Sequence, residues 1–138
     1  MADLRKAGHK VLVISGPPRD EIIRELSAFN IELDWQVDEV YSIVDYLLEK
    51  GVPMKQDTKG NWWASDAIWW SAKALICREH RVDYMVDDTF AYAAWFATTN
   101  THFIHFIDGK HNPHEGWAWP STGRAWPIAR RAPSSWYR

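Results

Sequence analysis

The sequence has a single cysteine, no long apolar run and almost no net charge, and each of these scarcities excludes a class of protein. Cys77 has no second cysteine to pair with, so no internal disulfide holds the fold together. No apolar run approaches the ~20 residues of a membrane-spanning helix, and the first residues lack the apolar core of a signal peptide. The formal net charge of -2 offers no broad basic surface for nucleic acid or for an anionic membrane. We therefore expect a cytoplasmic protein that binds no membrane and, as a whole, no nucleic acid.

Tryptophan is abundant by contrast, with ten residues in a chain of 138. An indole combines a large apolar face with one hydrogen-bond donor, so tryptophan-rich surfaces often contact bases, sugars or proteins. A chain of this length can form one core. We expect an α/β domain over residues 1–108, with Cys77 in its core, and an irregular Trp/Arg/Pro-rich tail over residues 109–138. Most of the tryptophans fall into two groups: Trp62, Trp63, Trp69 and Trp70, then Trp117, Trp119, Trp126 and Trp136.

Apolar periodicity predicts strands that alternate with helices. Short β-branched or aromatic runs predict strands over residues 9–15, 82–86 and 102–107. Apolar residues three and four apart predict helices over 19–29, 37–50 and about 66–80, and a short alanine- and aromatic-rich run predicts another over 90–98. Such alternation is typical of a three-layer Rossmann-like fold with a mostly parallel sheet, which binds ligands at the carboxyl ends of its strands. In the helix 66–80, which Ser65 or Asp66 would cap, the expected apolar face comprises Ile68, Trp69, Ala72, Leu75 and Ile76.

Two adjacent carboxylates, Asp87 and Asp88, follow the apolar strand 82–86. Neighbouring side chains on an extended backbone point to opposite faces, and two like charges repel each other. A Mg²⁺ ion or a cationic side chain nearby would relieve this repulsion, so a magnesium site is the first hypothesis. The alternative is that the two acids end the strand and cap the following helix, because Asp is a favoured N-cap residue.

Three features in chain order suit a phosphorylated ligand. The Ser15 hydroxyl and the Gly16 amide, at a strand-to-helix turn, can donate hydrogen bonds to phosphate oxygens. The Lys73 ammonium can neutralise both a phosphate and a carboxylate. Asp87 and Asp88 can hold a Mg²⁺ ion that bridges to the same phosphate. Together they predict a site for a small phosphorylated molecule with Mg²⁺.

This order of features resembles the haloacid dehalogenase (HAD) superfamily, whose second motif is an apolar strand ending in Ser or Thr, whose third is a lysine and whose fourth is an apolar strand ending in two acids. The resemblance implies a Mg²⁺-dependent phosphatase-type domain in which Ser15 and Lys73 are catalytic and bind phosphate with Gly16, while Asp87 and Asp88 bind the metal. The tryptophan-rich segment 62–70 is also similar to small superfamily members from phage genomes. The matching stretches, within residues 4–107, are AGHKVLVISG, SDAIWWSAKALICREH and VDYMVDDT.

The superfamily's first motif, a strand ending in Asp-x-Asp, has no match in the fourteen residues before Ser15. That motif supplies the aspartate nucleophile, so we expect little or no phosphatase activity from this chain alone. Three explanations stay open: a truncation, completion by another polypeptide, or a permuted order in which strand 103–107 runs into Asp108, with Phe106 at the nucleophile position. Because the missing strand is the central one in the family's sheet, its neighbours would need new partners, and we expect a homodimer or a completing chain.

Other residue groups suggest different functions. A non-catalytic binding or assembly module would use the tryptophan-rich surfaces to contact a partner protein. A second group could ligate zinc, although we expect it to be a mixed set of core and surface histidines: His102, His105, His111, His114 and Glu115. A third group could stack on single-stranded nucleic acid, against the overall acidic balance: Arg124, Arg130, Arg131 and Arg138, with Trp126 and Trp136.

Overall fold

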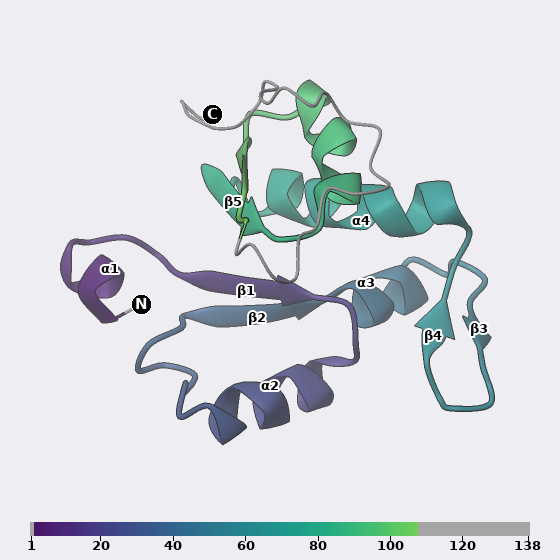
Figure 1. Cartoon of the computed structure of the whole chain (residues 1–138), viewed down its shortest axis with the longest axis horizontal. Coiled ribbons are helices and arrows are strands. Elements are labelled where there is room, and N and C mark those ends of the chain that lie inside the picture. Colours follow the sequence, from purple (N-terminus) through teal and green to yellow (C-terminus); the bar gives the residue numbers. More distant parts are fainter. Residues whose placement is uncertain (1, 108–138) are drawn as a thin grey trace. The chain divides into compact units, whose positions relative to one another are not determined.

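The computed structural model describes residues 2–107, in which helices alternate with strands (Figure 1). This part of the chain is mixed α/β and forms three two-stranded sheets, two of them parallel. It divides into two compact units that meet within one helix, between Ala72 and Lys73. None of the helices in residues 2–107 is long and apolar enough to cross a membrane. The predictions for the tail, including the permuted motif at Asp108 and the roles of His111, His114, Glu115 and the tail's arginines and tryptophans, lie outside the described residues.

Unit 1 begins with the short helix α1 (Ala2–Lys6), which is followed by a parallel strand–helix–strand segment. The elements of this segment are strand β1 (Leu12–Ser15), helix α2 (Arg19–Ala28) and strand β2 (Glu39–Ser42). The two strands pair in parallel, with Leu12 opposite Glu39 and Ser15 opposite Ser42. The predicted strand and helix are confirmed with shorter bounds, whereas α1 was not predicted.

The core of unit 1 forms where α2 lies along the β1–β2 sheet (Figure 1). Ile22 of α2 packs with Val37 and Val40, and all three side chains are buried. Partly buried apolar residues surround this cluster: Val11, Val13, Ile23, Leu26, Ile31 and Leu33. The helical spacing of apolar residues in 19–29 therefore marks a face that is buried against the sheet, as expected for an amphipathic helix.

The helix predicted over residues 37–50 was wrong in its first part. Residues 39–42 form β2, and helix α3 (Ile43–Glu49) begins only after Ser42, whose hydroxyl accepts a hydrogen bond of 3.0 Å from the backbone N–H of Asp45. Val40 fits the helical spacing of the apolar residues behind it, but pairing with β1 holds its backbone in a strand. The predicted helix stop is confirmed at Gly51, whose φ of +76° suits glycine.

A short antiparallel hairpin, β3 (Lys55–Gln56) and β4 (Trp62–Trp63), leads into helix α4 (Asp66–Glu79). The Asp57 carboxylate fixes the turn by accepting from the N–H groups of Lys59 at 2.8 Å and Asn61 at 2.9 Å. The predicted helix is confirmed, but its apolar face was partly wrong, because Ile68 and Leu75 are exposed. The buried residues of α4 include Ala72, Lys73, Ala74, Ile76 and Cys77, which confirms the expected burial of the cysteine.

Unit 2 contains a second parallel pair, β5 (Tyr84–Asp87) and β6 (His102–His105). The predicted strands are confirmed with shifted bounds. The segment between them, η1 (Phe90–Thr98), is a 3₁₀ helix. Its Phe96 ring lies 5.1 Å from the ring of Phe103 on β6, so η1 packs on one face of the sheet.

Candidate functional site

The candidate site lies in unit 2, where Lys73 of α4 forms an ion pair with Asp87 at the carboxyl end of β5. Both side chains are almost fully buried, with 9% of the lysine and 5% of the aspartate exposed. The Lys73 ammonium also lies 4.2 Å from the ring centroid of Tyr92, which stabilises the cation through the face of the ring. A buried charge is tolerated only when it has partners of opposite charge or suitable polarity. The buried Lys73 ammonium therefore requires Asp87, and the buried Asp87 carboxylate requires Lys73.

Burial raises the pKa of the Asp87 carboxyl above its ordinary value. The Lys73 ammonium and the hydrogen bond from the Thr89 N–H act in the opposite direction, because both favour the charged carboxylate, while the nearby Asp88 adds to the rise. The pKa of this carboxyl is therefore sensitive to each of its neighbours. Perturbation of this kind is common at functional sites, although structural ion pairs also produce it.

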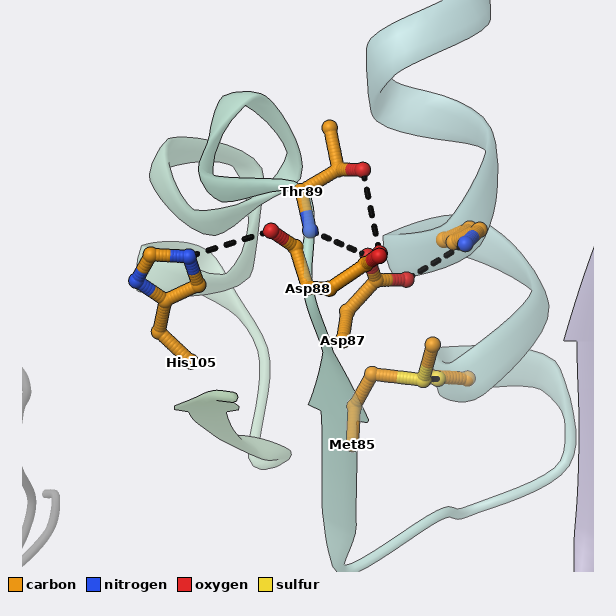
Figure 2. Close-up of polar contacts among 7 residues, drawn as sticks. Met85, Asp87, Asp88, Thr89 and His105 are labelled. Carbon is orange, nitrogen blue, oxygen red and sulfur yellow. Dashed lines mark hydrogen bonds and ion pairs between the residues drawn. The ribbon is translucent and has the colours of Figure 1, made fainter. Parts of the chain in front are cut away.

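Thr89 connects the two adjacent acids (Figure 2). Its backbone N–H donates to Asp87 Oδ1 at 2.7 Å, and its hydroxyl donates to Asp88 Oδ1 at 3.2 Å. The two carboxylates differ in environment, because Asp87 is buried against α4 while Asp88 is exposed. Thr89 therefore holds a buried and an exposed carboxylate at one strand end.

The histidines of β6 do not join a metal-binding group. His105 Nε2 lies 3.1 Å from the backbone oxygen of Asp88, and its ring packs 5.2 Å from that of Phe90. His102 stacks on Tyr84 at 5.4 Å. His102 and His105 thus fall on opposite faces of the sheet, as an extended strand requires. Within residues 2–107 no cluster of three or more His, Cys, Asp or Glu side chains could hold a metal ion.

The interpretation of the two acids as helix caps was not correct for η1. The N-cap of η1 is Thr89, and no side chain caps it by a hydrogen bond. Asp87 instead accepts from the N–H two residues later, which is the pattern of an Asx turn. This contact ends the strand and leaves the helix to begin without an acidic cap.

Asp87 and Asp88 suit Mg²⁺ as a small set of oxygen ligands. Magnesium usually keeps several waters and is held by one or two carboxylates plus the substrate phosphate, so two acids suffice in type and number. Asp88 is the more available ligand, because it is exposed, and its Oδ1 accepts one bond of 3.2 Å from the Thr89 hydroxyl. Asp87 has both oxygens engaged, Oδ1 by Thr89 and Oδ2 by Lys73.

Ser15 and Gly16 lie in unit 1, at the carboxyl end of β1. Gly16 accepts a hydrogen bond of 3.1 Å through its carbonyl oxygen from the backbone N–H of Val44. At the beginning of α2 the Arg19 N–H donates to Asp45 Oδ2 at 3.0 Å. A carboxylate therefore already occupies one donor at the positive end of this helix, where the sequence predicts a phosphate.

Residue type and chain order identified Lys73, Asp87 and Asp88, which the fold brings together, but missed Thr89 and Tyr92. Thr89 carried a weak signal, since a hydroxyl directly after two acids can bond to either of them. Tyr92 carried none, because a helix was predicted over 90–98 but nothing in the sequence indicated that the Tyr92 ring would lie beside Lys73.

Comparisons of the chain with protein-family models, with curated proteins and with solved structures gave no match.

Proposed function

We propose that this chain is a HAD-like, phosphatase-type domain that binds a small phosphorylated molecule with Mg²⁺ and turns it over very slowly by itself. The observation that supports this most is the buried Lys73–Asp87 ion pair with the exposed Asp88 beside it. A cation and two carboxylates at the carboxyl end of a parallel strand provide the charges that such a site needs. The proposal includes the finer three-layer Rossmann-like arrangement, of which the mixed α/β architecture with two parallel strand pairs is the coarser part.

Each residue of unit 2 has a separate part in this proposal. Bound Mg²⁺ would supply positive charge that stabilises the phosphoryl group. Asp88, exposed and lightly bonded, would hold the ion, and Asp87 would complete the site. Lys73 balances the charge of Asp87 and keeps that carboxylate oriented, while the Thr89 N–H and hydroxyl hold the two acids in place.

Slow turnover follows from the absence of a suitable nucleophile in the printed sequence. The sequence contains no Asp-x-Asp at any position. Asp87 is a poor substitute because it is buried and bonded to Lys73, which lowers its reactivity toward a phosphoryl group. We therefore expect this polypeptide to bind a phosphorylated molecule much faster than it hydrolyses it. A binding assay is thus a better first test than a rate assay.

The test compares Asp88→Asn with Asp83→Asn, a matched control in which the same change is made at an exposed acid just before β5. Calorimetry with inorganic phosphate and Mg²⁺ should show metal-dependent binding that Asp88→Asn weakens by about 10- to 100-fold, the loss typical of changes around a metal site, and that Asp83→Asn leaves intact. Equal binding by both variants and the wild type, or no effect of Mg²⁺, would contradict the proposal. Robust hydrolysis of p-nitrophenyl phosphate or nucleotides by the wild type would contradict the claim of slow turnover.

A second candidate function, an assembly module, is favoured by one face of the β5–β6 sheet. Tyr84 and Val86 are 65% and 58% exposed, on the face of β5 opposite to Met85 and Asp87. Apolar side chains gathered on one sheet face favour a protein contact over solvent. We take a second copy of the chain as the partner, because a dimer was expected from the sequence. Light scattering should then show a dimer that Val86→Asp dissociates, and a monomeric wild type at micromolar concentration would exclude it.

A further inference from the structure

We propose that the connection from α2 to β2 is a docking surface for an arginine-bearing segment of a partner protein, with the indole of Trp35 at its centre (Figure 1). Trp35 is 68% exposed and is the most exposed tryptophan that residues 2–107 contain. Tryptophans of this kind often dominate the binding energy of protein interfaces. This surface uses none of the residues that carry the proposed function and goes beyond that function.

Hydrogen bonds fix the backbone of this connection on both sides of Trp35. The Asp34 N–H donates to the carbonyl oxygen of Val37 at 2.7 Å, and Val37 is fully buried in the core of unit 1. The Trp35 N–H donates to the carbonyl oxygen of Glu32 at 3.3 Å. Asp34 has a φ of +70°, a conformation that persists where the surrounding contacts determine it. The backbone that carries the exposed indole therefore needs little ordering when a partner binds.

Arg5 of α1 supports the same turn. Its Nη1 atom donates to the carbonyl oxygens of Asp34 at 2.9 Å and of Trp35 at 2.7 Å, and its Nη2 atom lies 2.7 Å from Asp38 Oδ1. Asp38 also accepts from the Val11 N–H at 2.7 Å, which ties the turn to the beginning of β1. Because Asp38 balances the charge of the guanidinium, Arg5 holds the turn without making it positive.

The charges around Trp35 favour a cationic partner. Glu32 and Asp34 are exposed on the turn itself. Between Arg24 and Lys50 the chain has no lysine or arginine. In the same interval it has seven acids: Glu25, Glu32, Asp34, Asp38, Glu39, Asp45 and Glu49. A surface with this charge repels phosphates and nucleic acid and attracts basic protein segments.

Arginine suits this surface better than lysine does. A planar guanidinium stacks on the face of an indole and still directs its N–H groups to carboxylates, whereas the strongly hydrated lysine ammonium gains less from the ring. Trp35 supplies the face, and Glu32 and Asp34 supply acceptors three residues and one residue before it. Seven acids are more than a single guanidinium can bind, so a segment with several arginines is favoured over one free cation.

The test is an NMR titration of the ¹⁵N-labelled full chain with an acetylated and amidated tetra-arginine peptide, followed through the indole N–H signal of Trp35. The peptide should shift this signal and bind more tightly than tetralysine, while tetracitrulline, its neutral counterpart, should not bind. Trp35→Leu should weaken binding by roughly 2- to 30-fold, the range for loss of one cation–π contact. Trp35→Phe should retain part of the affinity. Glu32→Gln/Asp34→Asn should weaken binding and reduce its dependence on salt.

Two controls match these changes. Trp63→Leu removes another exposed tryptophan of unit 1, which pairs with Lys55 across its hairpin, and should leave peptide binding unchanged. Glu21→Gln/Asp83→Asn removes one Glu and one Asp at exposed positions outside the acidic interval and should reduce the affinity less than Glu32→Gln/Asp34→Asn does.

Equal affinity for tetracitrulline and tetra-arginine, or an affinity that Trp35→Leu does not change, would overturn the inference. A Trp35 signal that moves with protein concentration alone would assign the surface to a second copy and would also overturn it. A signal that Arg130→Gln/Arg131→Gln moves without peptide would do the same by assigning the surface to the chain's own arginines. None of these results would bear on the proposed function, which is measured separately with phosphate, Mg²⁺ and Asp88→Asn.

Discussion

Units 1 and 2 each contain two parallel strands joined through a helix, yet the groups at the carboxyl ends of the strands differ in charge. In unit 1, β1 and β2 end in Ser15 and Ser42, which lie opposite each other. In unit 2, β5 ends in Asp87, opposite His105 of β6. The neutral hydroxyl of Ser42 caps a helix, whereas the carboxylate of Asp87 is neutralised by a buried lysine. The same parallel pairing therefore ends in a helix cap in unit 1, whereas in unit 2 it ends in a buried ion pair whose carboxyl has a raised pKa.

The largest expected effect comes from breaking the charged end. Lys73→Met or Asp87→Leu alone leaves the other member of the pair buried without its partner, which should lower the free energy of unfolding by about 3–5 kcal/mol. The double variant Lys73→Met/Asp87→Leu removes both charges and should recover much of that loss. Urea denaturation of all three variants gives the measurement. A double variant that loses as much as the two single changes added together would mean that the pair does not act as a unit.

A smaller effect should distinguish the two neutral strand ends. Ser42→Ala removes the hydroxyl that accepts from the Asp45 N–H and should lower the free energy of unfolding by about 1 kcal/mol, as for other N-caps. Ser15→Ala, the matched change across the same strand pair, removes no cap and should cost less than about 0.5 kcal/mol. Thermal unfolding of the two variants decides the point, and equal losses would show that Ser15 has a structural role of its own.

The acids of the two units should titrate in opposite directions. The hydrogen bond from the Val11 N–H at 2.7 Å lowers the pKa of Asp38 below its ordinary value, with help from Arg5, whereas burial raises the pKa of Asp87. Asp38 therefore adds stability that is present above its unfolded pKa of 3.8 and is lost as the pH falls through the lower folded value. Asp87 has the opposite sign, since its contribution is present below its unfolded pKa and is lost as the pH rises through the folded value.

Carbon-detected NMR titration of the two carboxyl groups measures both midpoints directly. Asp38 should titrate below 3.8 and Asp87 above 3.8. In Asp38→Asn, the loss of stability relative to the wild type should shrink as the pH falls below that value. A loss that stays constant down to pH ~2 would show that charge on Asp38 does not contribute.

The smallest effect is expected at Cys77, where burial raises the thiol pKa to about 12. A protonated and buried thiol reacts slowly, so Ellman's reagent should modify Cys77 in the native protein no faster than the chain opens. The Asp87→Asn variant should react faster, because the loss of the ion pair loosens the packing of α4. Ser15→Ala, a change in unit 1 that should cost little stability, serves as the control and should leave the rate nearly unchanged. Rapid modification of the wild type would contradict the burial of this residue.

Local patterns in the sequence were enough to predict α2 and α4, because their apolar residues recur at helical spacing. They were not enough for β2, whose Val40 fits the same spacing as the helix that follows it. What decides for a strand is the pairing of residues 39–42 with β1, a contact between distant parts of the chain. The Ser42–x–x–Asp45 pattern carried the missing signal, since a hydroxyl at this spacing before an acid marks a helix beginning.

The members of the candidate site were predictable by type, but their geometry was not. Lys73 and Asp87 stood out as a cation and an acid in a suggestive order, whereas their direct contact depends on how α4 packs against β5. The exposure of Leu75 has the same origin, because periodicity indicates an apolar stripe without stating how much of it a neighbouring element covers. The bond from the Thr89 N–H to Asp87 depends on the backbone bend after the strand, which no spacing rule encodes.

The two parallel strand pairs, β1–β2 and β5–β6, also suggest the order in which parts of the protein fold during synthesis. Each parallel pair closes through a connection that contains one helix, and in unit 2 that helix has only 9 residues. Parallel pairing is slow because a loop must close first, but domains fold from the N-terminus as synthesis proceeds at roughly 5–20 residues per second, which leaves seconds for such pairing. We therefore expect β1 and β2 to pair on the ribosome before Asp87 has been added to the chain. The ion pair between Lys73 and Asp87 would then form later than the β1–β2 sheet.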